Sequence, residues 1–236
     1  MALLCYDLLR CYLTPADYLF VEPSAGHGAF SRLFPLGSRA YDIDPKNESI
    51  VRIDFFDVDL PYRDMIAVVG NPPFGKNASM AIKFFNHAAR RADIIAFIVP
   101  RSFQKPSIQK RLHRHFHLRR EWPIPDGAFQ FDGTPKTALT VFQIWEWAPE
   151  RRAVPIFAMT HPDFVFTKRD EADFMVRRIG GHVGKVHREF EQSDGSNYFI
   201  RAKKHYVETI LTEIDFTPVA ARTTGNPSLT KPELVV

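Results

Sequence analysis

The stretch Gly70-Asn71-Pro72-Pro73-Phe74-Gly75-Lys76 follows directly on the apolar run Met65-Ile66-Ala67-Val68-Val69. A short apolar run bounded by Gly and Pro predicts a buried strand, which places Asn71 at a strand end. Each proline fixes φ and lacks an N–H, and the residue before a proline is driven towards extended geometry. We therefore expect a stiff turn whose carbonyl groups are not used in helical hydrogen bonds.

This turn groups two hydrogen-bond acceptors with an aromatic ring. The Asn71 side chain and the Pro72 carbonyl can accept the two hydrogens of a planar amine, such as the exocyclic nitrogen of adenine, while Phe74 stacks on its flat side. Asn-Pro-Pro also occurs in ordinary turns. Its position after a predicted strand, about forty residues beyond a glycine-rich loop, favours the functional interpretation.

The glycine-rich loop is Glu22-Pro23-Ser24-Ala25-Gly26-His27-Gly28, which follows the apolar run Tyr18–Val21. Glycines let the backbone approach a ligand closely, and we expect the loop to lead into a helix. Ser31 stands where a dinucleotide fingerprint has its third glycine, and no Lys-Ser or Lys-Thr pair follows. The loop is therefore neither a dinucleotide fingerprint nor a phosphate-binding P-loop.

Acidic residues end two further apolar runs, in Tyr41-Asp42-Ile43-Asp44 and Ile53-Asp54-Phe55-Phe56. A carboxylate at the first position can accept both hydroxyls of a ribose, as in other doubly wound nucleotide sites. Asp54 could accept from an adenine amine, with Phe55 or Phe56 packed on the ring. Each acid alone is typical of an exposed turn, but the ordered series with Glu22 and Asn71 indicates one site.

In this order the motifs resemble those of class I S-adenosylmethionine-dependent methyltransferases that act on amino groups, specifically the adenine-N6 DNA methyltransferases. The family's four motifs match Glu22–Gly28, Asp42–Asp44, Asp54-Phe55 and Asn71–Phe74. The order, with the cofactor loop before the catalytic loop, is similar to the gamma arrangement, which places target recognition at the C-terminus. The resemblance covers roughly residues 14–147.

The resemblance implies a site and a mechanism. The target base would be flipped out of the duplex, and neither a metal nor a covalent enzyme intermediate would be needed. The family's upstream Thr-Pro segment has no match, because Thr14-Pro15 lies too close to Val21, and only its helix is expected, over Ala2–Cys11. The implied catalytic residues are Asn71, Pro72, Pro73 and Phe74; the implied cofactor-binding residues are Glu22, Pro23, Ala25, Gly26, Gly28, Asp42, Ile43, Asp54, Phe55 and Asn71.

Strand-like runs alternate with helical stretches, which predicts an α/β fold with a doubly wound sheet. The resemblance implies a Rossmann-like, seven-stranded class I methyltransferase sheet whose last strand is antiparallel. We expect an S-adenosylmethionine-binding catalytic domain over 1–148 and a small strand-rich C-terminal module over 161–236 that recognises the target. The expected strands are Tyr18–Val21, Ser38–Asp42, Ile50–Phe55, Met65–Val69, Ile94–Val99, Leu118–Pro123 and Thr137–Trp145, with a helix over Ala78–Ala92 and a long loop over 124–136.

Positive charge is concentrated in residues 101–120, which contain seven Lys or Arg, three His and no acid. Such a segment is the electrostatic footprint of a polyanion, although a solvated helix face would look the same. Phe129 or Phe131 resembles the family's second base-stacking aromatic. The residues expected to contact nucleic acid are Lys76, Lys110, Arg111, Arg114, Phe129, Arg177, Arg178 and Lys185.

Composition excludes several classes of protein. The chain has 236 residues, is 45% hydrophobic and carries a formal charge of +4. No apolar run reaches the roughly 18–20 residues that span a bilayer, and no secretion signal is evident at the N-terminus. Two cysteines are too few for a zinc site, and without a Pro-Cys dipeptide the nucleophile of cytosine C5 methylation is missing. We expect a cytoplasmic protein, bacterial or phage-encoded and associated with the nucleoid, with no metal and no membrane partner.

The sequence favours double-stranded DNA as the partner, with RNA as an alternative. It leaves the oligomeric state open, a dimer included, and does not separate a restriction-modification enzyme from an orphan or phage enzyme. Two other functions stay open: the same chemistry on RNA adenine or on a protein glutamine, and a non-catalytic nucleic-acid-binding subunit with this fold.

Overall fold

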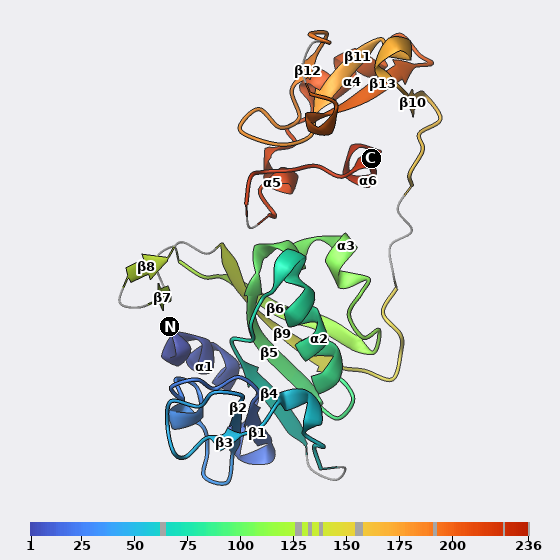
Figure 1. Cartoon of the computed structure of the whole chain (residues 1–236). Coiled ribbons are helices and arrows are strands. Elements are labelled where there is room, and N and C mark those ends of the chain that lie inside the picture. The colour runs from blue at the N-terminus through green and yellow to red at the C-terminus, as the bar shows by residue number, and fades with distance from the viewer. Residues whose placement is uncertain are drawn as a thin grey trace. The chain divides into compact units, whose positions relative to one another are not determined.

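The computed structural model describes residues 1–61, 65–125, 129–131, 134–136, 139–153, 158–190, 193–223 and 225–235. The chain divides into two compact units, Met1–Val154 and Pro155–Val236. Figure 1 shows both, and each is described by itself.

The first unit is built on a seven-stranded sheet in the order β3-β2-β1-β4-β5-β9-β6. Strands β1 to β5 pair in parallel, and β9 runs antiparallel to both of its neighbours, β5 and β6. This strand order, with the last strand reversed and inserted, is that of the Rossmann-like class I methyltransferase fold, as predicted. The strands are β1 (Leu19–Glu22), β2 (Arg39–Asp42), β3 (Val51–Arg52), β4 (Ile66–Gly70), β5 (Ile94–Pro100), β6 (Phe116–Pro123) and β9 (Thr140–Trp147).

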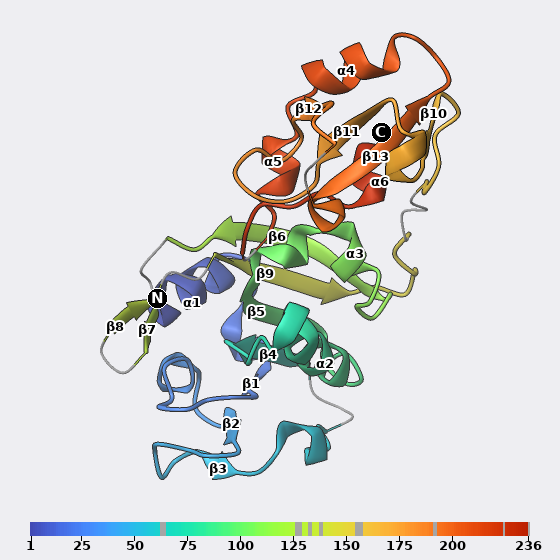
Figure 2. The same cartoon turned by 45° about the horizontal axis from the view of Figure 1, so that its top comes forward.

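Helices cover both faces of this sheet, which is why β4 and β5 are apolar and buried along their whole length. Helix α1 (Ala2–Arg10) lies on one face, and α2 (Ser79–Ala88) and the short α3 (Pro106–Gln109) lie on the other (Figure 2). Leu9 of α1 belongs to one apolar cluster and Phe85 of α2 to another, with the sheet between them.

The carboxyl ends of β1, β2 and β4 meet at one edge of the sheet. Val21 pairs with both Arg39 and Val68, so the segments that follow these strands emerge side by side. Because the chain winds from β1 towards β2 on one side and β4 and β5 lie on the other, this edge is the topological switch point of the sheet. Ligands bind at such points in open α/β folds.

Several predicted elements differ in extent. The third strand is short because Asp54 caps a 3₁₀ turn, η3 (Phe55–Asp57), which ends the extended run. The glycine-rich loop leads into turns and a single 3₁₀ turn, η2 (Ser31–Leu33), instead of the helix expected there. The segment expected to be a long loop contains a hairpin, β7 (Phe129–Phe131) with β8 (Thr134–Lys136). Short 3₁₀ turns also occur at η1 (Pro15–Asp17), η4 (Lys76–Ala78) and η5 (Arg101–Gln104).

The second unit is strand-rich, as predicted, and also contains short helices. Its antiparallel sheet has the order β10-β13-β11-β12, and Phe174 and Ile200 lie in its core. No helix in the described part of either unit is long and apolar enough to cross a membrane. The elements are β10 (Phe164–Phe166), η6 (Arg169–Glu171), β11 (Phe174–Arg177), β12 (Val186–His187), η7 (Asp194–Ser196), β13 (Asn197–Ala202), α4 (Val207–Glu213), α5 (Thr217–Ala220) and α6 (Lys231–Leu234).

Candidate active site

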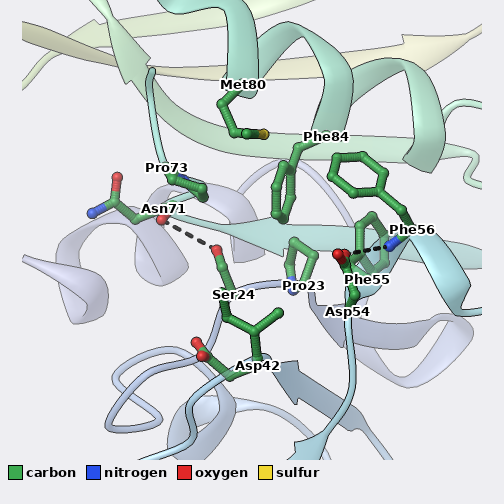
Figure 3. A pocket seen from close by; sticks show the side chains of 11 residues that line it. Pro23, Ser24, Asp42, Asp54, Phe55, Phe56, Asn71, Pro73, Met80 and Phe84 are labelled. Carbon is green, nitrogen blue, oxygen red and sulfur yellow. Dashed lines mark hydrogen bonds between the residues drawn. The ribbon is translucent and has the colours of Figure 1, made fainter. Parts of the chain in front are cut away.

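A pocket of about 400 Å³ opens at the carboxyl edge of the first unit's sheet (Figure 3). This volume lies within the usual range for small-molecule sites, roughly 300–1,000 Å³. Segments from five parts of the chain meet there, and its walls are mostly apolar with two carboxylates among them. The lining residues are Pro23, Ser24, Asp42, Ile43, Asp54, Phe55, Phe56, Asn71, Pro73, Met80 and Phe84.

Asp42, at the end of β2, holds the glycine-rich loop against the strand. Its Oδ2 accepts a hydrogen bond of 2.7 Å from the Gly26 N–H, and its Oδ1 accepts one of 2.7 Å from the Asp44 N–H. Gly26 has a φ of +51°, a conformation that favours glycine. Since a carboxylate offers about four acceptor sites, each Asp42 oxygen can still accept from a ligand. The carboxylate is thus fixed at the pocket wall with acceptor capacity to spare.

The opposite wall is aromatic. The Phe55 and Phe84 rings stack with their centroids 5.6 Å apart, and Phe56 meets Phe84 edge-on at 5.0 Å. Asp54 Oδ1 accepts a 3.0 Å hydrogen bond from the Phe56 N–H, which fixes the carboxylate beside these rings. An apolar wall with one oriented acceptor suits a flat heteroaromatic ring that carries an amine.

Glu22 lies beneath the loop and is only 2% exposed. Its Oε2 accepts a 2.7 Å hydrogen bond from the Ser31 N–H, across the turn that the loop makes. Burial raises the pKa of Glu22 to about 7, although hydrogen bonds from Ser31 and Phe30 oppose that shift. Glu22 was expected to contact the cofactor; the structure places it where it fixes the loop from below.

The Asn-Pro-Pro-Phe segment runs from the end of β4 along the rim of the pocket. The Asn71 carbonyl accepts from the Ser24 hydroxyl at 3.3 Å, which links this segment to the glycine-rich loop. The Asn71 side chain is exposed and points away from Phe84 in Figure 3. Within the described residues, neither the Asn71 side-chain oxygen nor the Pro72 carbonyl accepts a hydrogen bond, so both stay available to a ligand.

The segment is closed by strained backbone. The Phe74 carbonyl accepts from Met80 N–H at 3.1 Å, which draws the chain back onto α2. Gly75 has a φ of +68° and a ψ of 174°, a region that essentially only glycine adopts, and Asn77 and Ala78 have φ values of +52° and +60°. A Cβ on Gly75 would lie 2.9 Å from that of Met80. Gly75 therefore decides the path by which the segment leaves the pocket.

The structure brings most of the predicted site residues together. Of the cofactor-binding set, Pro23, Asp42, Ile43, Asp54, Phe55 and Asn71 line the pocket, and Ala25, Gly26 and Gly28 form the adjoining loop. Of the catalytic set, Asn71 and Pro73 line it, whereas Pro72 is buried and Phe74 is half-buried beside it.

Sequence reasoning missed three lining residues, Ser24, Met80 and Phe84. Met80 and Phe84 lie four residues apart on α2, a spacing that puts them on one face of a helix. That spacing is also typical of core residues. Only their closeness to the Asn-Pro-Pro-Phe segment could have indicated that this face ends in a pocket.

The basic segment lies largely away from the pocket. Lys76 is exposed next to the catalytic segment, and Lys110, Arg111 and Arg114 are also exposed. However, Arg114 lies two residues before β6 begins, where Phe116 pairs with Trp147 at the opposite edge of the sheet. The structure therefore does not bring Arg114 together with Asn71, because the chain must return across the sheet before β6 begins.

In the second unit, the predicted arginines make internal contacts. Arg177 Nε donates to the Ile179 carbonyl at 3.2 Å, and Arg178 Nη1 donates to the Gly195 carbonyl at 3.2 Å and lies over the Tyr198 ring. Lys185 is exposed. The Phe129 side chain lies outside the described residues. Among the residues that the structure does describe, no group of three or more His, Cys, Asp or Glu could hold a metal ion.

Comparisons with known proteins give only distant structural likenesses. No protein-family model matches the chain. No curated protein matches it either.

Three of the solved structures that it resembles are described as methyltransferases or as part of a restriction enzyme. A putative RNA methyltransferase from Pyrococcus horikoshii is 19% identical, with 61% of this chain and 82% of that chain covered and a TM-score of 0.41. The modification subunit of a putative type I restriction enzyme from Vibrio vulnificus is 13% identical, with 70% and 45% covered and a TM-score of 0.44. The 23S rRNA methyltransferase ErmE is 17% identical, with 62% and 68% covered and a TM-score of 0.44. The function proposed below rests on the residues of the pocket and not on these likenesses.

Proposed function

We propose that this protein is a methyltransferase that uses S-adenosylmethionine to methylate the N6 amine of adenine in double-stranded DNA. The observation that carries the proposal is the pocket itself. It joins Asp42 and Asp54, the acids expected to bind a nucleoside, to the Asn71–Pro73 rim, which is expected to bind an amine. Residues from two separate sequence predictions, the nucleoside site and the amine site, thus line the same pocket.

The pocket fits the nucleoside part of the cofactor. Asp42 would accept from the ribose hydroxyls with the capacity left by its bonds to Gly26 and Asp44. The Asp54 carboxylate would accept from the adenine amine while Phe55 and Phe56 provide the apolar wall for its ring. When bound, the cofactor would supply an electrophilic methyl group on a sulfonium ion.

The rim fits the amine that receives the methyl group. The Asn71 side-chain oxygen and the Pro72 carbonyl would accept its two hydrogens, and Phe74 would stack on the flipped base. Held in this way, the amine nitrogen would be aimed at the methyl group that the bound cofactor supplies, and the proton that the amine loses on transfer would leave to solvent. Catalysis by this chain is then mostly positioning.

The test compares Asn71→Ala with Asn77→Gly in methyl transfer to duplex DNA, with N6-methyladenine measured by mass spectrometry. Loss of one transition-state acceptor costs about 3 kcal/mol, so we expect Asn71→Ala to lose at least a hundredfold in rate and still bind the cofactor in calorimetry. Asn77 is exposed on the same segment and its φ of +52° suits glycine, so this control should keep its activity. Near-normal activity of Asn71→Ala would refute the catalytic role of Asn71.

The same assay separates the alternatives. If methylated product forms on RNA oligonucleotides or on a glutamine peptide and none forms on DNA, the proposed amine methylation stands and the proposed substrate is wrong. Failure to bind S-adenosylmethionine would instead favour a non-catalytic nucleic-acid-binding subunit. We also propose that the unit over 161–236 contributes to target recognition, since Lys185, Arg201, Lys203 and Lys204 are exposed on it.

A further inference from the structure

The edge of the sheet opposite the active-site pocket carries a second hollow, of about 340 Å³. Ile94, the first residue of β5, pairs with Glu146 near the end of β9, so this hollow lies at the amino ends of the parallel strands. The active-site pocket lies at their carboxyl ends. The hollow is lined by Ala89, Arg90, Arg91, Ala92, Asp93 and Trp147, and we call it the Trp147 hollow.

Trp147 lies at the surface although its side chain is large and apolar. The residue is 46% exposed, which distinguishes it from Trp145, two residues earlier and 1% exposed. The backbone N–H of Trp147 donates to the Asp93 carbonyl at 2.8 Å. The indole lies nearly parallel to the His115 ring, with an interplanar angle of 17° and a centroid distance of 5.9 Å. The contact with His115 restricts the indole, which lowers the ordering cost for a ligand that stacks on it.

The surroundings of the indole are positive. Arg90 and Arg91 are exposed in the wall of the hollow. From the basic segment, His115 stacks on the indole and His113 lies next to His115. The His113 and His115 ring centroids are 5.6 Å apart, and burial, followed by the charges of His115 and Arg151, lowers the pKa of His113.

Three acids near the hollow, Asp59, Asp93 and Glu146, take part in contacts within the protein. Asp93 Oδ2 accepts from the Ile66 N–H at 2.8 Å, and Asp59 lies 4.0 Å from Arg91. Glu146 accepts from Arg119 at 2.7 Å. Glu150 is exposed, and its carbonyl is hydrogen-bonded to His117.

We propose that the Trp147 hollow binds single-stranded nucleic acid, with one base stacked on the indole and the neighbouring phosphates on Arg90 and Arg91. A positive groove combined with an aromatic platform is how proteins hold single strands without reading their sequence. In a duplex the bases are stacked on each other, so a platform for one base selects an unpaired strand. The proposal is independent of methyl transfer, because it concerns other residues at the other edge of the sheet.

The test measures binding of fluorescent oligothymidine to the full chain without cofactor. Stacking of a base on an aromatic side chain contributes about 1–3 kcal/mol. Since 1.4 kcal/mol is a tenfold change, we expect Trp147→Leu to weaken binding by about ten- to a hundredfold and Trp147→Phe to recover part of it. For the double variant Arg90→Gln/Arg91→Gln, the slope of log affinity against log salt should fall by about 1.4, at about 0.7 for each phosphate contact.

Lys83→Gln is the matched charge control, because Lys83 is exposed on the same helix, α2, but does not line the hollow. It should leave binding nearly unchanged. An oligonucleotide with 5-bromouracil should cross-link to Trp147 on irradiation, with the modified peptide identified by mass spectrometry.

Unchanged affinity of a Trp147→Leu variant that melts like the parent would overturn the proposal, as would equal binding of duplex and single strand. Equal competition by poly-glutamate would overturn it too, because it would indicate a site for any polyanion. Asn71→Ala should bind oligothymidine normally. The failure of the catalytic proposal and the failure of this one can therefore be told apart.

Discussion

The buried carboxyl group of Glu22 makes the stability of this protein depend on pH in a direction opposite to that of most acids. Its pKa is raised from 4.5 to about 7, mainly by burial. The folded protein therefore holds this proton more tightly than the unfolded chain does. The stabilisation from the proton is complete below pH 4.5 and is lost as the pH rises through 7.

The size of the effect follows from the two pKa values. A difference of one in pKa corresponds to about 1.4 kcal/mol, so an ionised Glu22 costs the folded state about 3 kcal/mol above pH 7. Gln has the same shape, accepts the same Ser31 N–H and carries no charge. We expect Glu22→Gln to raise the free energy of unfolding by about 3 kcal/mol at pH 8 and by only about 1 kcal/mol at pH 5.5.

Urea unfolding at the two pH values measures this difference. Glu48→Gln is the control, because Glu48 is exposed in the same region and should change stability little at either pH. Cofactor binding at pH 8 should survive in Glu22→Gln, since the hydrogen bond to Ser31 is kept. If the variant were less stable than the parent at pH 8, Glu22 would be a stabilising charge and the reasoning from burial would be wrong.

Three further predictions concern the site and its support. Asp42→Ala should weaken S-adenosylmethionine binding by about 1.5–3 kcal/mol in calorimetry, and Asp42→Asn by less; equal affinities in all three proteins would move the ribose contact to Asp44. Gly75→Ala should lower the free energy of unfolding, measured in urea, by about 1–3 kcal/mol, because the φ of +68° and the closeness of Met80 leave no room for a methyl group. Gly37→Ala is the control and should lower it less, because nothing lies within 4 Å of the added Cβ. Arg152→Met should lower the free energy of unfolding by about 3 kcal/mol, because the Arg152 guanidinium donates to the carbonyls of Phe116 and Gln109 at 2.9 and 3.0 Å. A loss below about 1 kcal/mol in urea unfolding would show that water replaces these hydrogen bonds.

The sequence predicted the sheet because its central strands carry the strongest signal. Residues 66–70 and 94–99 are apolar throughout, and such runs bounded by turns indicate strands buried on both faces. Because parallel strands have their carboxyl ends at the same edge of the sheet, the polar residues that follow such strands lie at that edge. This is why Asp42, Asp54 and Asn71 could be predicted as neighbours without knowledge of their contacts.

The features that could not be predicted from the sequence depend on side-chain caps that compete with the strand pattern and on tertiary contacts. The Asp54 side chain accepts from the Phe56 N–H and caps a 3₁₀ turn, and a cap of this kind outweighs the apolar pattern that suggested a longer strand. The basic segment looked like one surface, but its residues run from one edge of the sheet to the other. Arg177 and Arg178 are of a residue type that commonly contacts DNA. Only the structure shows that their guanidinium groups donate hydrogen bonds to backbone carbonyls of the same unit.

The position of β9 has a consequence for how the first unit folds. This strand is the last of its sheet along the chain, yet it lies between β5 and β6 and is the neighbour through which β6 joins the sheet. Until residues 140–147 have been synthesised, β5 has an open, apolar edge and β6 has no partner. An unpaired edge of this kind is prone to aggregate, and pairing that spans such sequence distances forms slowly. A nascent chain that stalls before Thr140 is thus the form of this protein that we expect to need a chaperone.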